Sequence, residues 1–275
     1  MSLKSICSIN WNWEKINEFS KKSGWLYRGQ KVADWPLKTS LERCCQRQSI
    51  VPEKVREFED RLLREFQRAY HQYTQHIPAQ NDKIQWLSVM QHYGAPTRLL
   101  DFTYSIYIAA YFATEYADDN SVIWAINGKW AVDESASLFE KAGKDKERTK
   151  KMRGLFDKDC EDCADSIFFK EPYALAAYPI NPFSLNQRLL IQRGVFLIPG
   201  DITKSLMENL EALPNHEEQE NIVKIVIPKD ERREVLKQLW NMNISRASLF
   251  PGLDGFAQSL NVYHYAYDPV WKPIT

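Results

Sequence analysis

One stretch, from Gln91 to Ala113, constrains the fold more than any other part of the sequence. It reads QHYGAPTRLLDFTYSIYIAAYFA and divides into a polar first half and an apolar second half. The second half predicts a helix that begins after a capping serine, Ser105. One side of this helix carries Ile106, Ala109, Ala110 and Ala113. Because these residues are mostly small, we expect another element to approach the helix closely and to pack tightly against it.

The polar first half lies between two predicted helices. The preceding helix spans residues 81–93, with Asn81 or Asp82 as its cap and Gly94 at its end. Pro96 fixes one backbone angle in the connecting loop, so we expect the loop to hold its side chains rigidly. The polar side chains of this loop are His92, Tyr93, Thr97, Arg98, Asp101 and Thr103.

This polar loop is a candidate anion site, because free amide donors point outward at the start of the helix that follows. The alternative is an ordinary structural role. In that case Asp101 or Thr103 only caps the next helix, and His92 bonds to a backbone carbonyl.

A second candidate site is a short predicted strand, GWLYRGQ, around Trp25. Alternation places Arg28 on the face opposite Trp25 and Tyr27. An arginine among aromatic residues needs acceptors for its five donors, and a carboxylate, carbonyls or a ligand phosphate can supply them. We expect Gly29 to end the strand and to let a ligand or another backbone come close. The alternative is a buried ion pair with Asp101 or Glu42.

The remaining pattern predicts an α+β fold. Residues 52–70 read as an amphipathic helix, SVIWAIN as a buried strand, and residues 131–165 as a charged helical excursion whose run KAGKDKERTKK is solvated or mobile. The segments SIFFK, RGVFLIPG and NIVKIVIP read as strands. Two helices follow the last two of these strands, the first capped by Asp201, and helical spacing resumes beyond Gly252. We therefore expect one elaborated domain with a mixed or antiparallel sheet and packed helices.

Charge and hydropathy exclude several classes of partner. The chain has 36 Lys and Arg against 36 Asp and Glu, so it carries no long-range field that would attract nucleic acid or an acidic membrane. No window approaches 18 uninterrupted apolar residues, and the first residues do not resemble a secretion signal. We expect a soluble, cytoplasmic protein with no membrane partner, for which nucleic acid is an unlikely ligand.

The sequence favours neither a metal site nor a known nucleophile motif. The five cysteines are irregularly spaced and should be reduced. Cys160 and Cys163 form a CxxC pair, but zinc requires a second pair that the sequence lacks. The five histidines are spaced too irregularly to form a metal cage, so we expect no metal cofactor. The motifs of P-loop, Rossmann and serine-hydrolase proteins are also missing.

Several segments, in order along the chain, resemble the FRG domain family, which is named for a Phe/Tyr-Arg-Gly motif. They are LYRGQ, WPLKTSLER, WLSVMQHYGAPTRLLDFTYSIYIAAYFA, NQRLLIQRGVFLIP and SLFPGLDGFAQSL. This resemblance implies that residues 1–275 form a single FRG-type domain. It brings no settled activity with it.

The YRG motif on an early strand is also similar to the first motif of Arg-Ser-Glu type ADP-ribosyltransferases, which have an α+β fold. That resemblance implies that Arg28 holds the phosphates of NAD, a contact that arginine geometry favours. Bacterial domains of this kind occur in toxins and in phage-defence systems. Two departures stand out. Thr39 and Ser40 are the only trace of a Ser-Thr-Ser strand, and Gln192 replaces the catalytic glutamate in the late strand.

Glutamine can orient a ribose hydroxyl but cannot stabilise an oxocarbenium-like centre with negative charge. Asp101 or Glu42 would have to supply that charge. The catalytic candidates are therefore Arg28, Asp101 and Gln192. The candidates for binding the nucleotide are Tyr27, Gly29, Gln30, Ser40, His92, Tyr93, Thr97, Arg98 and Thr103.

Three hypotheses of function follow. The first is an NAD-handling enzyme, either an ADP-ribosyltransferase or an NAD glycohydrolase, in which NAD is the substrate. The second is a sensing module that recognises a nucleotide or a phage protein in the same pocket without turning it over. The third is nucleic-acid binding through aromatic stacking, which the neutral net charge disfavours.

Overall fold

The structure is a computed structural model of the chain. It describes residues 6–75, 77–152, 160–182, 184, 186–215 and 221–262, and for residues 160–162 it describes the backbone only.

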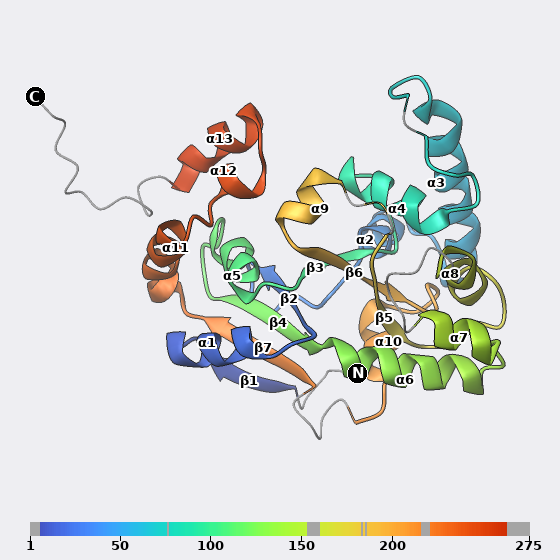
Figure 1. Ribbon diagram of the computed structural model, residues 1–275, viewed down its shortest axis with the longest axis horizontal. Helices are drawn as coiled ribbons and strands as arrows, with labels where there is room; N and C mark the ends of the chain where they lie inside the picture. The colour runs from blue at the N-terminus through green and yellow to red at the C-terminus, as the bar shows by residue number, and fades with distance from the viewer. Residues whose placement is uncertain are drawn as a thin grey trace, which may run out of the picture.

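A seven-stranded mixed sheet forms the centre of the molecule (Figure 1). The strand order is β1-β7-β4-β2-β3-β6-β5. Neighbouring strands are antiparallel except for β1 and β7, which are parallel. The strands are β1 (Cys7–Asn10), β2 (Trp25–Gln30), β3 (Leu100–Thr103), β4 (Ser121–Asn127), β5 (Ala177–Ile180), β6 (Gly194–Pro199) and β7 (Ile222–Ile227). The predicted α+β class with packed helices is confirmed.

Helices cover both faces of this sheet. On one face α1 (Trp13–Lys21), α5 (Ile106–Thr114) and α11 (Arg232–Asn241) share a core cluster with alternate residues of β2, β4 and β7. On the other face α6 (Gly128–Lys141) and α10 (Leu206–Glu211) pack against Leu26, Trp124 and Leu197. The alternation of apolar residues on both sides of the central strands is what allows a helix layer on each face.

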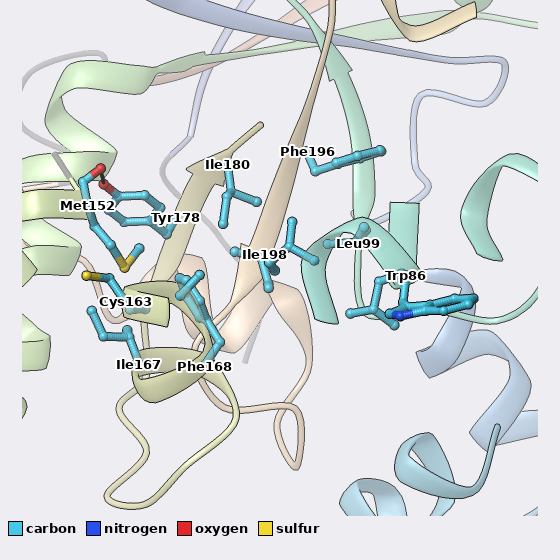
Figure 2. Packing of buried hydrophobic residues seen from close by; sticks show 14 of the residues in the cluster. Trp86, Leu99, Met152, Cys163, Ile167, Phe168, Tyr178, Ile180, Phe196 and Ile198 are labelled. Carbon is cyan, nitrogen blue, oxygen red and sulfur yellow. Dashed lines mark hydrogen bonds between the residues drawn. The ribbon is translucent and has the colours of Figure 1, made fainter. Parts of the chain in front are cut away.

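A third core cluster lies at the β5–β6 end of the sheet. It joins these strands to α3 (Val55–Tyr70), α4 (Lys83–His92) and α8 (Cys160–Phe168). Figure 2 shows Tyr178 of β5 within this cluster, and its hydroxyl donates a hydrogen bond of 2.7 Å to the carbonyl of Met152. In Figure 1 these helices gather at the end of the molecule opposite α1, α5 and α11.

Shorter elements complete the described chain. They are α2 (Ser40–Arg47), η1 (Pro52–Lys54), α7 (Lys146–Met152), α9 (Gln187–Ile191), η2 (Lys229–Glu231), α12 (Arg246–Leu249), α13 (Leu253–Ser259) and η3 (Leu260–Val262).

The predicted elements near the polar loop are confirmed. The strand around Trp25 is β2, although it continues through Gly29 to Gln30. The helix before the loop is α4, capped by Asp82, and Gly94 follows its end with a positive φ of 81°. The helix after it is α5, capped by Ser105. The loop also contains β3, which the sequence did not indicate.

Two local predictions were wrong. SIFFK is not a strand, because its first three residues end α8 and bury Ile167 and Phe168 in the core. The cap of α10 is Ser205, which forms a capping box with Glu208, and not Asp201.

The charged run KAGKDKERTKK, predicted to be solvated or mobile, is mostly exposed. Lys144 is an exception: it is buried, and its ammonium donates to the carbonyls of Ser166 and Lys170. The helix before the run, α6, is largely buried.

Gly29 sets the distance between β2 and α5. A Cβ atom at this position would lie 2.0 Å from the carbonyl oxygen of Ala109 and 2.4 Å from the amide nitrogen of Ala113. The backbone of α5 therefore occupies the space above Gly29. The small residues of α5 and the glycine of β2 together allow the two backbones to come this close.

Gly29→Ala should lower the free energy of unfolding by about 3 kcal/mol or more, because backbone atoms on both sides must move apart. Urea unfolding followed by circular dichroism measures this. The control is Gly194→Ala, where the closest atom is the terminal Cδ1 of Leu189, a flexible group that can turn away. Equal losses for the two variants would contradict the tight seat of α5 on β2.

Candidate functional site

The central sheet opens between β2 and β3. β2 pairs with β4 over six positions, from Trp25 to Gln30, and β3 pairs with β6 over all four of its residues. Between β2 and β3 themselves only Tyr27 and Thr103 are paired. The two strands share one contact and then separate, so the sheet has a gap at its middle.

A pocket with a cavity volume of about 710 Å³ lies in this opening. Consecutive residues of both strands line it, 27–30 of β2 and 101–103 of β3. Since consecutive strand residues point to opposite faces, side chains from both faces of the sheet line the pocket. The other lining residues are Lys31, Trp35, Pro36, Lys38, Arg43, Gln46, Phe112, Tyr116, Arg188 and Gln192.

The three residues predicted as catalytic, Arg28, Asp101 and Gln192, all line this pocket. Arg28 Nη1 donates a hydrogen bond of 2.6 Å to the backbone carbonyl of Asp101, across the gap between the strands. Its Nε is buried and has no hydrogen-bond partner within the described residues. Burial lowers the pKa of Arg28 and the nearby Asp101 opposes this, but a guanidinium remains charged at neutral pH.

Asp101 is available to a ligand and does not cap a helix. Its Oδ2 accepts a hydrogen bond of 2.8 Å from Gln91 Nε2, and its side chain is exposed at the pocket. The cap of α5 is Ser105, whose backbone N–H donates to Thr103 Oγ1. Neither Asp101 nor Thr103 therefore caps α5, although the Thr103 hydroxyl supports the capping residue.

The pocket concentrates positive charge, although the chain as a whole is neutral. Asp101 is the one acidic residue among its lining residues, and Arg188 is one of five basic ones. Arg188 makes no hydrogen bond and no ion pair within the part of the chain that the structure describes. The basic lining residues are Arg28, Lys31, Lys38, Arg43 and Arg188. A pocket of this charge suits an anionic ligand.

Gln192 reaches the pocket from a turn. The prediction that it lies in a late strand is wrong. Gln192 is the residue at which α9 ends, before β6 begins. Its Nε2 donates a hydrogen bond of 3.1 Å to the carbonyl of Leu249, and its own carbonyl accepts one of 2.7 Å from Thr103 Oγ1. The side-chain amide is thus held in place by α12.

A chain of hydrogen bonds behind the pocket orients Asp101. Ser40 Oγ accepts from the backbone N–H of Thr97 at 2.9 Å, and Thr97 Oγ1 donates to Gln91 Oε1 at 2.6 Å. With its oxygen engaged there, Gln91 presents its Nε2 to Asp101. Ser40 and Thr97 do not line the pocket, so they act on it through Gln91. Sequence analysis missed Gln91, because nothing local links it to Asp101.

Two further predicted residues are fixed by the core around the pocket. The Tyr27 hydroxyl donates a hydrogen bond of 2.8 Å to the carbonyl of Phe19. Gln30 Oε1 accepts one of 2.9 Å from Trp124 Nε1. Gly29 lines the pocket, but its close neighbour is the backbone of α5. These residues shape the wall of the pocket and leave few free groups for a ligand.

His92 and Tyr93 lie beside the pocket and not in its lining. Their rings contact each other edge to face, with centroids 4.9 Å apart. Tyr93 is 67% exposed. Partial burial lowers the pKa of His92, and the neighbouring Arg188 lowers it further. His92 lines two smaller neighbouring pockets, and Asp101 and Arg188 line one of them with it.

Arg98 lies in the core, away from the pocket. Its Nε donates to both carboxylate oxygens of the buried Glu59, at 2.8 and 3.0 Å, and Nη1 donates to the carbonyl of Phe168 at 2.8 Å. Its guanidinium also stacks on Phe169, 4.4 Å from the ring centroid. These contacts join the loop before β3 to α3 and α8, and they neutralise the charge of Arg98 without a ligand.

Glu42, the other carboxylate considered for catalysis, lies elsewhere. It lines a separate pocket of about 260 Å³, and its Oε1 accepts a hydrogen bond of 2.8 Å from the backbone N–H of Leu206. Burial raises its pKa. Thr39 and Ser40 begin α2 and are not part of a strand. Of the two carboxylates, only that of Asp101 belongs to the pocket that Arg28 lines.

Among the residues that the structure describes, no group of three or more His, Cys, Asp or Glu side chains could hold a metal ion. Cys7, Cys44, Cys45 and Cys163 form no disulfide. The side chain of Cys160, and with it the CxxC prediction, lies outside the described residues. No helix in the described ranges is both long and apolar enough to cross a membrane.

The early strand with Arg28, the polar loop and α5 form one continuous part of the chain. Residues 23–121 match the FRG domain. This FRG segment contains Arg28, Gln91 and Asp101, and it ends at the first residue of β4. Arg188 and Gln192 complete the pocket from outside it. No curated protein and no solved structure matches the chain.

Arg98→Met should lower the free energy of unfolding by about 3–5 kcal/mol, because it leaves the Glu59 carboxylate buried without a partner. Urea denaturation measures the loss. The double variant Arg98→Met/Glu59→Leu should recover much of it, since no buried charge remains. Arg64→Met, at an exposed position of the same helix as Glu59, should change stability by less than about 0.5 kcal/mol. A double variant as unstable as the single one would contradict this account.

Proposed function

We propose that the pocket between β2 and β3 binds a nucleotide through its phosphates and that NAD is the nucleotide it acts on. One observation carries the proposal. Two arginines with unused donors, Arg28 and Arg188, line the same pocket as the carboxylate of Asp101. Arginine forks bind phosphate oxygens in pairs, and a carboxylate beside them is the group that a reacting ribose needs.

The size and the lining of the pocket agree with such a ligand. A cavity of about 710 Å³ is within the range of small-molecule sites, which runs from about 300 to 1,000 Å³. Trp35, Phe112 and Tyr116 line it together with the basic residues. Aromatic faces support nucleobases by stacking, so the pocket offers a surface for the base as well as donors for the phosphates.

The reaction would break the bond between the nicotinamide nitrogen and C1′ of its ribose. Nicotinamide leaves as a neutral molecule with the bonding electrons, and positive charge develops on the ribose ring. The Asp101 carboxylate would stabilise that charge. Water in a glycohydrolase, or a nucleophile of a target protein in an ADP-ribosyltransferase, then bonds to C1′ and releases a proton. Arg28 would hold the phosphates throughout.

A sensing module that binds a nucleotide or a protein without turnover is the second candidate. It is favoured by the bonding of the groups nearest the reacting position. Gln192 is an amide held by the Leu249 carbonyl, and Asp101 already accepts a hydrogen bond from Gln91. Such a pocket can recognise a ligand without a second acid or base to assist its cleavage. A role in toxin action or phage defence belongs to either hypothesis.

Asp101→Asn separates catalysis from binding. Release of nicotinamide from NAD should fall by about 100-fold or more, because the amide cannot offset the charge on the ribose. Binding of NAD, measured by calorimetry, should persist because the arginines remain. Asp230→Asn, at an exposed position in η2, is the matched control and should retain full activity. An Asp101→Asn variant that releases nicotinamide at the control rate would refute the catalytic role.

Nucleotide binding itself is tested by thermal unfolding with NAD, ADP-ribose and ADP. A nucleotide at 100 times its dissociation constant should stabilise the protein by about 2.7 kcal/mol. Arg28→Gln should raise the dissociation constant of that nucleotide by about tenfold or more, since charged hydrogen bonds are lost. Stabilisation without nicotinamide release would support the sensing module. Stabilisation by none of the three would refute both nucleotide hypotheses.

A further inference from the structure

Arg188 is shared by two pockets. It lines the main pocket and also a second one of about 390 Å³. The second pocket lies between α9 on one side and the segment of α12 and α13 on the other, and Arg246 and Phe250 belong to its walls. Arg28 and Asp101 do not line this second pocket, whereas His92, a candidate for binding the nucleotide, does.

Two arginines of this pocket are stacked on a single aromatic ring. The guanidinium carbon of Arg188 is 4.6 Å from the centroid of Phe250, and that of Arg246 is 4.3 Å from the same centroid. Phe250 is itself fixed by an edge-to-face contact with Phe112 of α5, at 6.0 Å. Phe250 thus contacts both positive charges. Burial lowers the pKa of Arg188, the negative charge of Asp101 opposes this, and a smaller repulsion from Arg246 lowers it further.

The acidic groups nearby leave part of this charge unpaired. The buried Glu115 accepts hydrogen bonds of 2.8 and 3.0 Å from Arg246 Nη1, which satisfies one end of that side chain. Arg246 Nε is buried without a partner within the described residues. Arg188 has no acceptor there either. Asp254 lines the pocket but is exposed and forms no ion pair with either arginine.

We propose that Arg188 and Arg246, mounted on Phe250, form a second anion site that takes a phosphate group. Arg188 has no acceptor and Arg246 pairs with Glu115 through Nη1 only, so an anion bound by both side chains would reduce their repulsion and accept hydrogen bonds from donors that remain free. The site is distinct from Arg28 and does not depend on NAD being the ligand of the main pocket. The phosphate group belongs either to a second ligand or to the far end of a ligand that already occupies the main pocket.

The test follows the Nε–Hε signals of isotope-labelled arginines by NMR while inorganic phosphate is added at constant ionic strength. The signals of Arg188 and Arg246 should shift together with one dissociation constant. That constant should be the same in Arg28→Gln within about twofold. Arg233, exposed on α11, is the internal control and should not shift. The absence of a shift at Arg188 and Arg246, or its loss in Arg28→Gln, would overturn the proposal.

Two variants test the Phe250 ring and the charge without removing either arginine. Phe250→Leu should raise the dissociation constant of phosphate by about threefold or more, because the two guanidinium groups lose the ring on which both stack. Asp254→Asn should lower the dissociation constant of phosphate, because a competing negative charge disappears. Unchanged affinity in both variants would overturn the proposal. Adding a saturating nucleotide separates the two sources: continued phosphate binding indicates a second ligand, and competition indicates the far end of the same one.

Discussion

The single contact between β2 and β3 is the constraint on which the site depends. Tyr27 and Thr103 pair, and beyond them the strands diverge, so that backbone groups and side chains of both strands face one opening. Arg28 spans the gap by bonding to the carbonyl of Asp101, in the place where a strand ladder would otherwise continue. β2 pairs along its length with β4, and β3 with β6, but β2 and β3 pair with each other at one position only, so a pocket opens between two central strands.

The two buried arginines of the FRG segment show how environment decides the role of a side chain. Arg98 has a carboxylate, a carbonyl and an aromatic ring around it, so every part of its guanidinium has a partner. Arg28 has one carbonyl and a buried, unused Nε. The sequence indicated both as candidates, Arg28 because it lies among aromatic residues and Arg98 because it lies in the polar loop. Only the surroundings contributed by distant segments, such as Glu59 and Phe168, separate a structural arginine from one that can bind a ligand.

Local sequence patterns predicted the helices and strands near the site, but they did not predict which residues come together in it. Strand alternation around Trp25 and the capping serine before α5 act over a few residues, and both were predicted correctly. Arg188 lies in α9 and Gln192 follows it, about 160 residues beyond β2 in the sequence, so their place in the pocket depends on how α9 packs. The same dependence on tertiary packing explains SIFFK, where branched and aromatic residues favoured a strand but the core received a helix face.

The residues that line the pocket lie on both sides of residue 121, where the FRG segment ends. The arginine, the carboxylate and the glutamine that orients it belong to the matched part, whereas α9, its terminal glutamine and Phe250 belong to the rest of the chain. The two parts are in direct contact, because Thr103 bonds to the carbonyl of Gln192 and the ring of Phe112 packs against that of Phe250. A substitution on either side of residue 121 can therefore change the shape of the same pocket.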